Sequence, residues 1–174
     1  MKPHCNTCML SAHCTDISQF GHNDQKVDKN ISVAQFETNL KTFVSDVRTA
    51  GGTPILVTSL SRRNFNSTGQ VTLNLAPQVA ATLRVAAETG SAYIDLNKAS
   101  VAYLSAIGLT NAYKYNLKPE DRTHLNYPGS LVFGNIVGSL IEQSQVAKEV
   151  RNYIKGDKAI LKAVKNGQFI FPEV

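Results

Sequence analysis

The sequence has no tryptophan, three cysteines and no long apolar run. A membrane-spanning helix needs roughly 18–20 apolar residues, so no transmembrane segment is predicted. Three clustered cysteines are too few for a domain built on disulfides. The 18 Lys and Arg residues outnumber the 13 Asp and Glu residues, but they are scattered along the chain. Nucleic-acid binding, which usually needs a concentrated basic stripe, is therefore not predicted.

The amino terminus has neither the charged start nor the apolar core of a secretory signal peptide. It does hold residue types that zinc prefers, at spacings shorter than those of a typical zinc site. These residues are His4, Cys5, Cys8, His13 and Cys14. We predict an irregular segment over residues 1–19, with no metal and no cofactor.

Beyond it, the 174 residues and the 43% hydrophobic content suit one domain. A helix is predicted from Ser32, where Gln35 completes a capping box, to the Gly51-Gly52 pair. A second helix is predicted over residues 75–89, with Val79, Leu83 and Ala86 facing inward. Further helices are predicted from Asn97 to Gly108, from Pro128 onward, and in a basic tail from about residue 145 to residue 164.

Short apolar runs at residues 55–57 and 92–94 alternate with these helices and predict buried strands. The alternation is typical of an α/β fold, a doubly wound parallel sheet with helices on both faces. Ligands bind such sheets at the carboxyl ends of the strands. Candidate functional residues should therefore follow a strand directly.

Two short motifs stand in loops of this kind. The first is Phe20-Gly21-His22-Asn23-Asp24, in which Gly allows a tight turn and Asn offers an amide N–H to a developing oxyanion. The second is Asp121-Arg122-Thr123-His124, in which a carboxylate can orient a histidine that acts as general base. Taken singly, the first is also compatible with an ordinary turn and the second with a loop ion pair.

Taken together and in this order, the motifs resemble those of the SGNH (GDSL-type) hydrolases, and more closely the rhamnogalacturonan acetylesterases. The segment Thr58-Ser-Leu-Ser-Arg-Arg-Asn-Phe65 is similar to one these enzymes carry after a strand, and the resemblance covers about residues 20–141. It implies a flavodoxin-like sheet and removal of an acyl group, acetyl above all, from a carbohydrate such as a pectic polysaccharide. It assigns His124 as general base, Asp121 as its orienting partner and Asn23 as oxyanion donor, with no metal or cofactor.

The chain departs from the family in one respect, because no Gly-Asp-Ser block precedes Gly21. The sequence has one Gly-Asp, Gly156-Asp157, near the opposite end. We therefore expect that residues 20–174 are a partial domain without its first strands, inactive by itself and poorly soluble because a central strand becomes an edge. We expect the full-length parent to be extracellular, in line with the glycosylation acceptors Asn30-Ile-Ser32 and Asn66-Ser-Thr68.

Two other functions stay open at this point. One is a non-catalytic relative that binds carbohydrate, which the missing serine favours. The other is a metal-dependent hydrolase that uses the amino-terminal Cys/His tract with His124. Arg62 and Arg63 fit either a sugar-carboxylate site or a solvated loop, and His22 fits either substrate contact or a hydrogen bond within its turn. The sequence predicts no oligomeric state.

Overall fold

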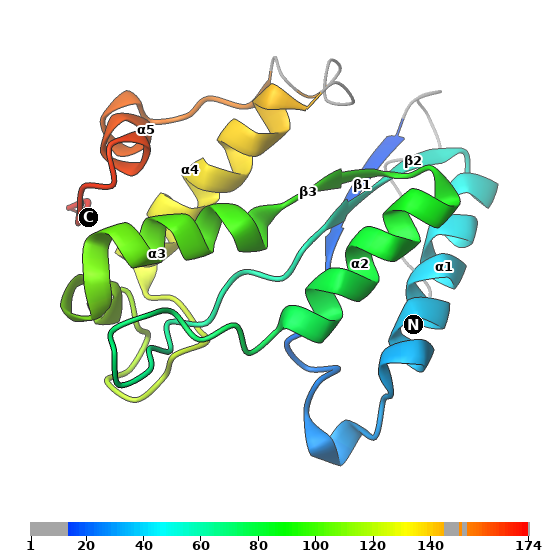
Figure 1. The fold of residues 1–174 in the computed structure, drawn as a ribbon. Helices are drawn as coiled ribbons and strands as arrows, with labels where there is room; N and C mark the ends of the chain where they lie inside the picture. Colours follow the sequence, from blue (N-terminus) through cyan, green and yellow to red (C-terminus); the bar gives the residue numbers. More distant parts are fainter. Residues whose placement is uncertain (1–13, 145–149, 151–152, 174) are drawn as a thin grey trace.

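A computed structural model describes residues 14–144, 150 and 153–173 of the chain. Its sheet consists of three parallel strands, β1 (Cys14–Gln19), β2 (Gly52–Val57) and β3 (Ala92–Ile94), in the order β1-β2-β3 (Figure 1). The strands predicted at 55–57 and 92–94 are confirmed. The prediction of an irregular segment up to residue 19 is wrong for its last part, because residues 14–19 form β1 and pair in parallel with β2. Apart from Cys14, the Cys/His tract lies outside the described residues.

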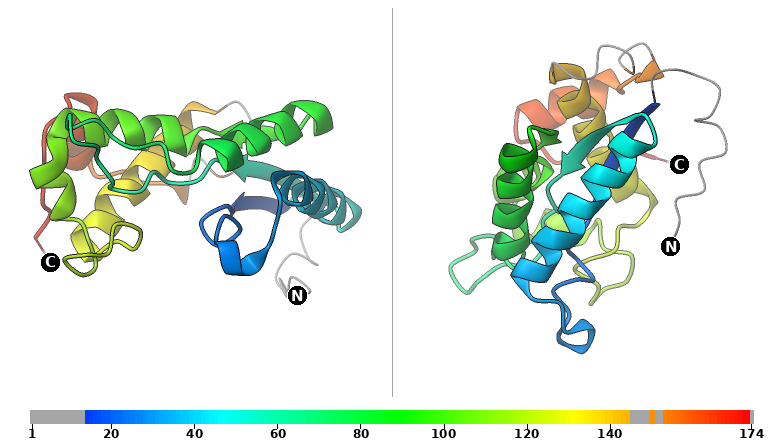
Figure 2. Two further views of the ribbon diagram at one scale, coloured as in Figure 1. Left: turned by 60° about the horizontal axis from the view of Figure 1, so that its bottom comes forward. Right: turned by 90° about the vertical axis from the view of Figure 1, so that its right-hand side faces the viewer.

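Helices cover both faces of this sheet. Leu56, near the carboxyl end of β2, is buried against α1 (Val33–Thr49) and α2 (Ala76–Thr89). The adjacent side chains Ile55 and Val57 are buried in a second cluster with α3 (Leu96–Tyr113) and α4 (Tyr127–Gln143). Successive side chains of a strand point to opposite faces, so a strand buried on both sides is apolar throughout. Figure 2 shows α1 and α2 side by side. The predicted α/β class with helices on both faces is confirmed.

The boundaries of α1 follow the predicted capping signals. The Ser32 side chain accepts a hydrogen bond from the Gln35 backbone N–H at 3.1 Å, and the chain leaves the helix before Gly51, whose φ is +79°. The end of α2 is also as predicted, with Gly90 in the left-handed conformation. These residues stop the helices because glycine adopts positive φ without steric cost.

The inward face of α2 differs from the prediction. Val79 and Leu83 are only partly buried, whereas Ala86 is buried as expected. The buried face is centred instead on Gln78, Ala81, Thr82, Val85 and Ala86. Ala81 and Ala86 have small side chains, so α2 lies close to α1 and to Leu56. A pattern of large apolar residues does not detect a face that is built from small ones.

The third helix was predicted wrongly at its start, whereas its predicted end, Gly108, is the point where the helix is interrupted. It is capped by Asp95, whose side chain accepts from the Lys98 N–H at 3.1 Å, and not by Asn97. Gly108 (φ +72°) kinks the helix, which continues to Tyr113. The Asn97 side chain instead donates to the Ser59 carbonyl at 2.8 Å. Asn97 therefore holds the loop that follows β2.

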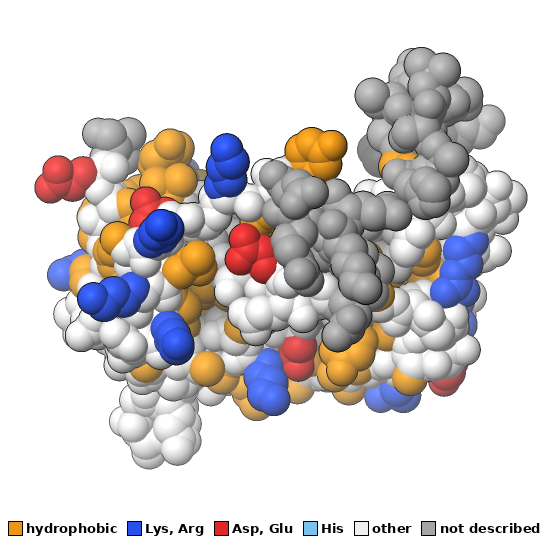
Figure 3. All heavy atoms as spheres, turned by 90° about the horizontal axis from the view of Figure 1, so that it is seen from above, with side chains coloured by type: hydrophobic (Ala, Val, Ile, Leu, Met, Phe, Trp, Pro, Cys, Tyr) orange, Lys and Arg blue, Asp and Glu red, His pale blue; other side chains and the backbone are white. Residues whose placement is uncertain are grey.

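In the carboxyl-terminal region, α5 (Lys158–Lys165) lies against α4 and buries Ile160. Residues 153–157 contain no α-helix. Within the described residues, only the last part of the helix predicted over 145–164 is therefore present, as α5. On the face drawn in Figure 3, Lys and Arg side chains occur at the α5 end and also at the opposite end, with Asp and Glu among them.

No helix in the described part of the chain has the length and apolar character needed to cross a membrane.

The turn after β1 fits tightly against the loop after β2. Gly21 has a φ of +122°, and its N–H donates to the Asp24 carboxylate at 3.0 Å. The Ser59 hydroxyl donates to the Phe20 carbonyl at 2.6 Å. A Cβ at Gly21 would overlap the Ser59 hydroxyl and approach Gln78 Cβ to 3.2 Å. Glycine is therefore required here by both its backbone conformation and the space available.

We predict that Gly21→Ala lowers the free energy of unfolding by about 3 kcal/mol, since it adds a steric overlap to backbone strain. Gly69→Ala is the matched control, because Gly69 has a φ of +78° and a Cβ added there would meet no atom within 4 Å. Only the backbone cost, about 1 kcal/mol, applies there. Urea denaturation measures the free energy of unfolding of both variants. Equal decreases in Gly21→Ala and Gly69→Ala would contradict the tight fit at Gly21.

Candidate active site

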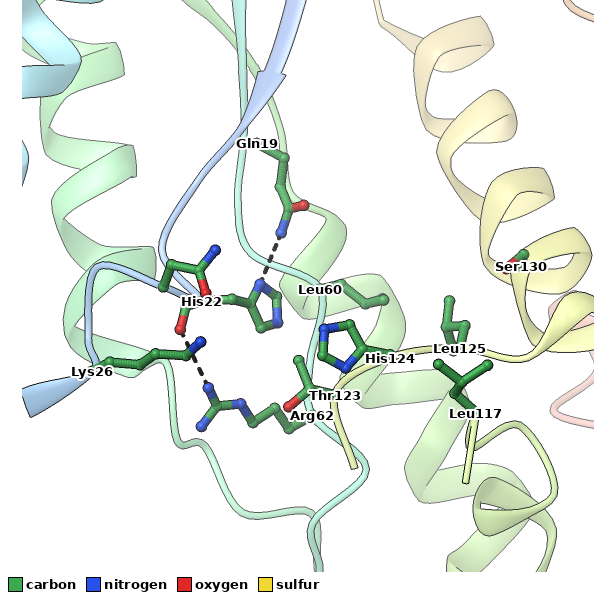
Figure 4. A pocket seen from close by; sticks show the side chains of 11 residues that line it. Gln19, His22, Lys26, Leu60, Arg62, Leu117, Thr123, His124, Leu125 and Ser130 are labelled. Atoms are coloured by element: carbon green, nitrogen blue, oxygen red, sulfur yellow. Dashed lines mark hydrogen bonds between the residues drawn. The ribbon is translucent and has the colours of Figure 1, made fainter. Parts of the chain in front are cut away.

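Three loops meet at the carboxyl ends of the strands and enclose an open pocket of about 610 Å³ (Figure 4). One is the turn after β1, one follows β2, and one precedes α4. The pocket is lined by Gln19, His22, Asn23, Lys26, Leu60, Arg62, Leu117, Thr123, His124, Leu125 and Ser130. The place of this pocket agrees with the rule that ligands bind parallel sheets at that edge.

Asp121 and His124 form the hydrogen-bonded pair that their spacing predicts. The His124 Nδ1 lies 2.8 Å from Asp121 Oδ2. The other carboxylate oxygen, Oδ1, accepts the backbone N–H groups of His124 at 2.8 Å and of Thr123 at 2.9 Å. A single carboxylate thus closes the turn and orients the imidazole.

These contacts determine the charge of the carboxylate. The backbone N–H groups of His124 and Thr123, followed by the His124 side chain, hold the pKa of Asp121 well below its usual range. Asp121 is therefore ionised at neutral pH and accepts a hydrogen bond from Nδ1. The Nε2 atom of the same ring is then the one available to a bound molecule. The imidazole is 71% exposed and lines the pocket.

Asn23 lies at the same pocket. Its side chain is exposed, and within the described residues no hydrogen bond holds its amide. Its neighbour Asp24 has a structural role instead, since it accepts the Gly21 N–H. The structure thus brings Asn23 and His124 to one cavity, with Asp121 behind the histidine. An amide donor and an imidazole facing one cavity are suited to acyl-transfer chemistry.

His22 also lines the pocket, and its Nδ1 lies 3.3 Å from Gln19 Nε2. Burial first, and then the charge of Arg62, lower the pKa of His22. The ring is therefore neutral at neutral pH. The Nδ1 contact is made with the last residue of β1 and not within the turn, and the ring lines the cavity.

The two arginines of the loop after β2 have different environments, so the interpretation as a solvated pair is wrong. Arg62 is half-buried, lines the pocket and donates to the His22 carbonyl at 3.4 Å. Arg63 is fully buried and does not line the pocket. Its guanidinium donates to the side-chain oxygen of Asn116 and to the carbonyl of His124, each at 2.6 Å. The sequence did not indicate this role of Arg63. It also did not indicate that Gln19 and Lys26 line the pocket, for which their closeness to the end of β1 was the only available signal.

Among the described residues, no serine that lines the pocket forms a hydrogen bond with His124. The one serine that lines the pocket there, Ser130, donates its hydroxyl to the Asn126 carbonyl at 3.0 Å. The sequence's one Gly-Asp pair also lies elsewhere, because Asp157 caps α5 by accepting the N–H groups of Ala159 and Ile160.

A metal centre has no support from the residues that the structure describes, which include no group of three or more His, Cys, Asp or Glu side chains placed to hold an ion. The proposed ligands His4, Cys5, Cys8 and His13 lie outside those residues.

We predict that Asp121→Asn lowers the Tm near neutral pH, and that the difference shrinks in acid. The folded-state pKa of Asp121 is depressed. Its carboxylate therefore stabilises the fold above the unfolded-state pKa of about 3.9, and this stabilisation is lost as the pH falls through the folded value. Glu120→Gln in the same loop is the control, because its side chain is 94% exposed. A Tm difference that is independent of pH from neutral to strongly acidic solution would contradict this assignment.

The comparisons with known proteins concern the sequence and the fold. No protein-family model matches the sequence. A curated relative, rhamnogalacturonan acetylesterase RhgT of Bacillus subtilis (strain 168), is 29% identical over an alignment of 137 residues, and the match covers 72% of this chain and 59% of that protein.

Two solved structures share the fold. Protein YxiM of Bacillus subtilis matches with a TM-score of 0.67 and 26% identity, over 82% of this chain and 38% of that one. A lipase/acylhydrolase from Enterococcus faecalis matches with a TM-score of 0.53 and 23% identity, over 82% of this chain and 63% of that one. The chain spans less than two thirds of each of these relatives. The chain is thus similar in sequence to a rhamnogalacturonan acetylesterase, and it has the fold of YxiM and of the lipase/acylhydrolase, which is that of the SGNH-type hydrolases.

Proposed function

We propose that this chain carries the general base and an oxyanion donor of an esterase that removes acyl groups, acetyl above all, from a carbohydrate. The observation that carries the proposal is the Asp121–His124 hydrogen bond beside a pocket that Asn23 also lines. The acetylesterase relative supports the same reaction.

The reaction that fits this arrangement is a two-step acyl transfer. A serine hydroxyl, supplied by a Gly-Asp-Ser segment, attacks the ester carbonyl carbon while Nε2 of His124 takes its proton. The Asn23 amide N–H donates to the oxyanion that forms. The bond to the sugar oxygen then breaks as the imidazolium returns the proton to that oxygen. Water hydrolyses the acyl-enzyme by the same proton transfers, and Asp121 stays ionised throughout.

The substrate we infer is an acylated carbohydrate that carries carboxylates, such as a pectic polysaccharide. The pocket lining supports this, because it includes Lys26 and Arg62 and no Asp or Glu among the described residues. A planar guanidinium binds a carboxylate through two parallel hydrogen bonds. The neutral ring of His22 lines the same pocket as Arg62 and the base, where it can bind a sugar hydroxyl.

We further propose that the 174 residues do not turn over an ester in the absence of a Gly-Asp-Ser segment, because the only serine that lines the described pocket is held by a backbone carbonyl. We also propose that the full-length parent is extracellular. The exposure of Asn30 and Asn66, the acceptors of the two glycosylation motifs, supports this.

The test is to assay acetate release from acetylated pectic oligosaccharides by two proteins, the 174-residue chain and the product of the longest reading frame that contains it. We expect no turnover by the chain alone. If the longer product supplies a Gly-Asp-Ser segment, we expect it to be active, and we expect His124→Ala to reduce its kcat by about 10³-fold or more.

The matched control is Tyr153→Ala, which truncates a side chain that is 85% exposed and does not line the pocket. Turnover that survives His124→Ala would contradict the assignment of the base. Binding of the oligosaccharide without hydrolysis by the longer product would favour the other candidate, a non-catalytic carbohydrate-binding relative.

A further inference from the structure

Arg63 is the largest of the fully buried side chains, and it lies beneath the turn that carries the Asp121–His124 pair. Its Nε donates to Asn116 Oδ1, and its Nη2 donates to the carbonyls of His124 at 2.6 Å and of Asp121 at 3.3 Å. Its own backbone N–H donates to the Arg122 carbonyl at 3.0 Å. One residue from the loop after β2 therefore contacts three of the four residues from Asp121 to His124.

The acceptors are neutral oxygens rather than a carboxylate. Burial lowers the pKa of Arg63 to about 10, and the nearby Asp121 charge opposes that shift, so the guanidinium is charged at neutral pH. A buried charge is costly unless several well-placed partners satisfy it. A carbon side chain of similar length would avoid this cost if stability were the only requirement. The cost is explained if the guanidinium fixes the geometry of the groups that it contacts.

The contacted carbonyls belong to the two ends of the turn. The carbonyls of Asp121 and His124 receive the guanidinium from below, while the N–H groups of Thr123 and His124 bind the Asp121 carboxylate from within. The His124 carbonyl also accepts the Leu117 N–H at 3.0 Å, which ties the turn to the start of the same loop. With both ends held, the backbone that carries the carboxylate and the imidazole cannot change its conformation unless the buried contacts of Arg63 break.

We propose that Arg63 is a positioning residue for the Asp121–His124 pair, and that its guanidinium holds the turn in the conformation that keeps the carboxylate within hydrogen-bond distance of Nδ1. The catalytic meaning of this role rests on the proposed esterase function. The positioning itself does not, because it concerns a hydrogen bond that is present without substrate. A histidine base loses rate steeply when its geometry loosens, so a residue of this kind limits kcat without contacting the substrate.

The test uses NMR on the folded 174-residue chain, where no turnover is needed. Two signals report the pair: the far-downfield Nδ1–H proton of His124 and the titration of the Asp121 carboxyl carbon. In Arg63→Lys, an ammonium cannot reach Asn116 and the turn carbonyls together. We expect loss of the downfield proton signal and a rise of the Asp121 pKa toward its ordinary value, since the N–H donors that depress it move. Arg63→Met should produce the same changes more strongly.

Arg48→Met is the matched control. Arg48 also donates to a backbone carbonyl, that of Thr89 at 2.9 Å, but it lies in α1, away from the pocket lining. We expect this variant to lose some stability and to leave both Asp121 and His124 signals unchanged. A change of the same size in Arg48→Met would show that the signals report general loosening and would overturn the proposal.

A folded Arg63→Lys that keeps the downfield proton and the depressed Asp121 pKa would also overturn it. If neither Arg63 variant folds, hydrogen exchange in the unaltered chain decides. The amides of Thr123 and His124 should exchange as slowly as those of β2, and exchange at the rate of an open loop would contradict the proposal. Absence of esterase activity in any longer protein would count against the proposed function and would leave these readouts unaffected.

Discussion

The loop that follows β2 is the constraint on which the rest of the site depends. Thr58, Ser59, Ser61 and Arg63 are polar, and all are buried. Thr58 and Ser61 bind the start of α3, Ser59 binds the turn after β1, and Arg63 binds the turn before α4. Thr58 Oγ1 donates to Asp95 and accepts the Asn97 N–H, Ser59 donates to the Phe20 carbonyl, and the Ser61 N–H donates to Ser100. Together with the contacts of Arg63, these bonds fix the turn after β1 and the turn before α4 relative to one another.

This arrangement gives a physical reason for the composition of the loop. Burying polar groups is costly unless their hydrogen bonds are made, and here the partners are backbone groups and side chains of the flanking elements. Among the described residues, Nη1 of Arg63 is an exception, because it is buried without a hydrogen-bond partner. The strand before the loop must instead be apolar, because Ile55, Leu56 and Val57 are buried between two layers of helices. The rigid strand fixes the position of the first residue of the loop. The loop in turn fixes the positions of the two turns that carry Asn23 and His124 to the shared pocket. Loops carry function most effectively when a rigid scaffold positions them in this way.

Much of this could be predicted from the sequence because the signals are local. The cap at Ser32, the stop at Gly90 and the apolar runs of β2 and β3 depend on residues within a few positions of each other. The Asp121–His124 contact is local as well, since three residues in a turn bring the carboxylate to the imidazole. The family resemblance added the placing of Asn23 beside them, which spacing alone could not indicate because about a hundred residues separate it from His124.

The role of Arg63 was not predictable, because an arginine next to another arginine is far more often solvated than buried. The continuation of α3 past Gly108 was missed because glycine usually ends a helix, and here it produces a kink.

The central claim is that the cavity shared by Asn23, His22 and His124 receives an acylated, carboxylate-bearing carbohydrate. The most direct measurement is an amide and imidazole NMR titration of the 174-residue chain with an acetylated pectic oligosaccharide, with the deacetylated oligosaccharide as comparison. We expect saturable shifts centred on Asn23, His22 and His124, larger for the acetylated ligand, and weaker binding in Arg62→Met. Shifts confined to another surface, such as the apolar cavity between α4 and α5, or no saturable shifts with either ligand, would contradict it.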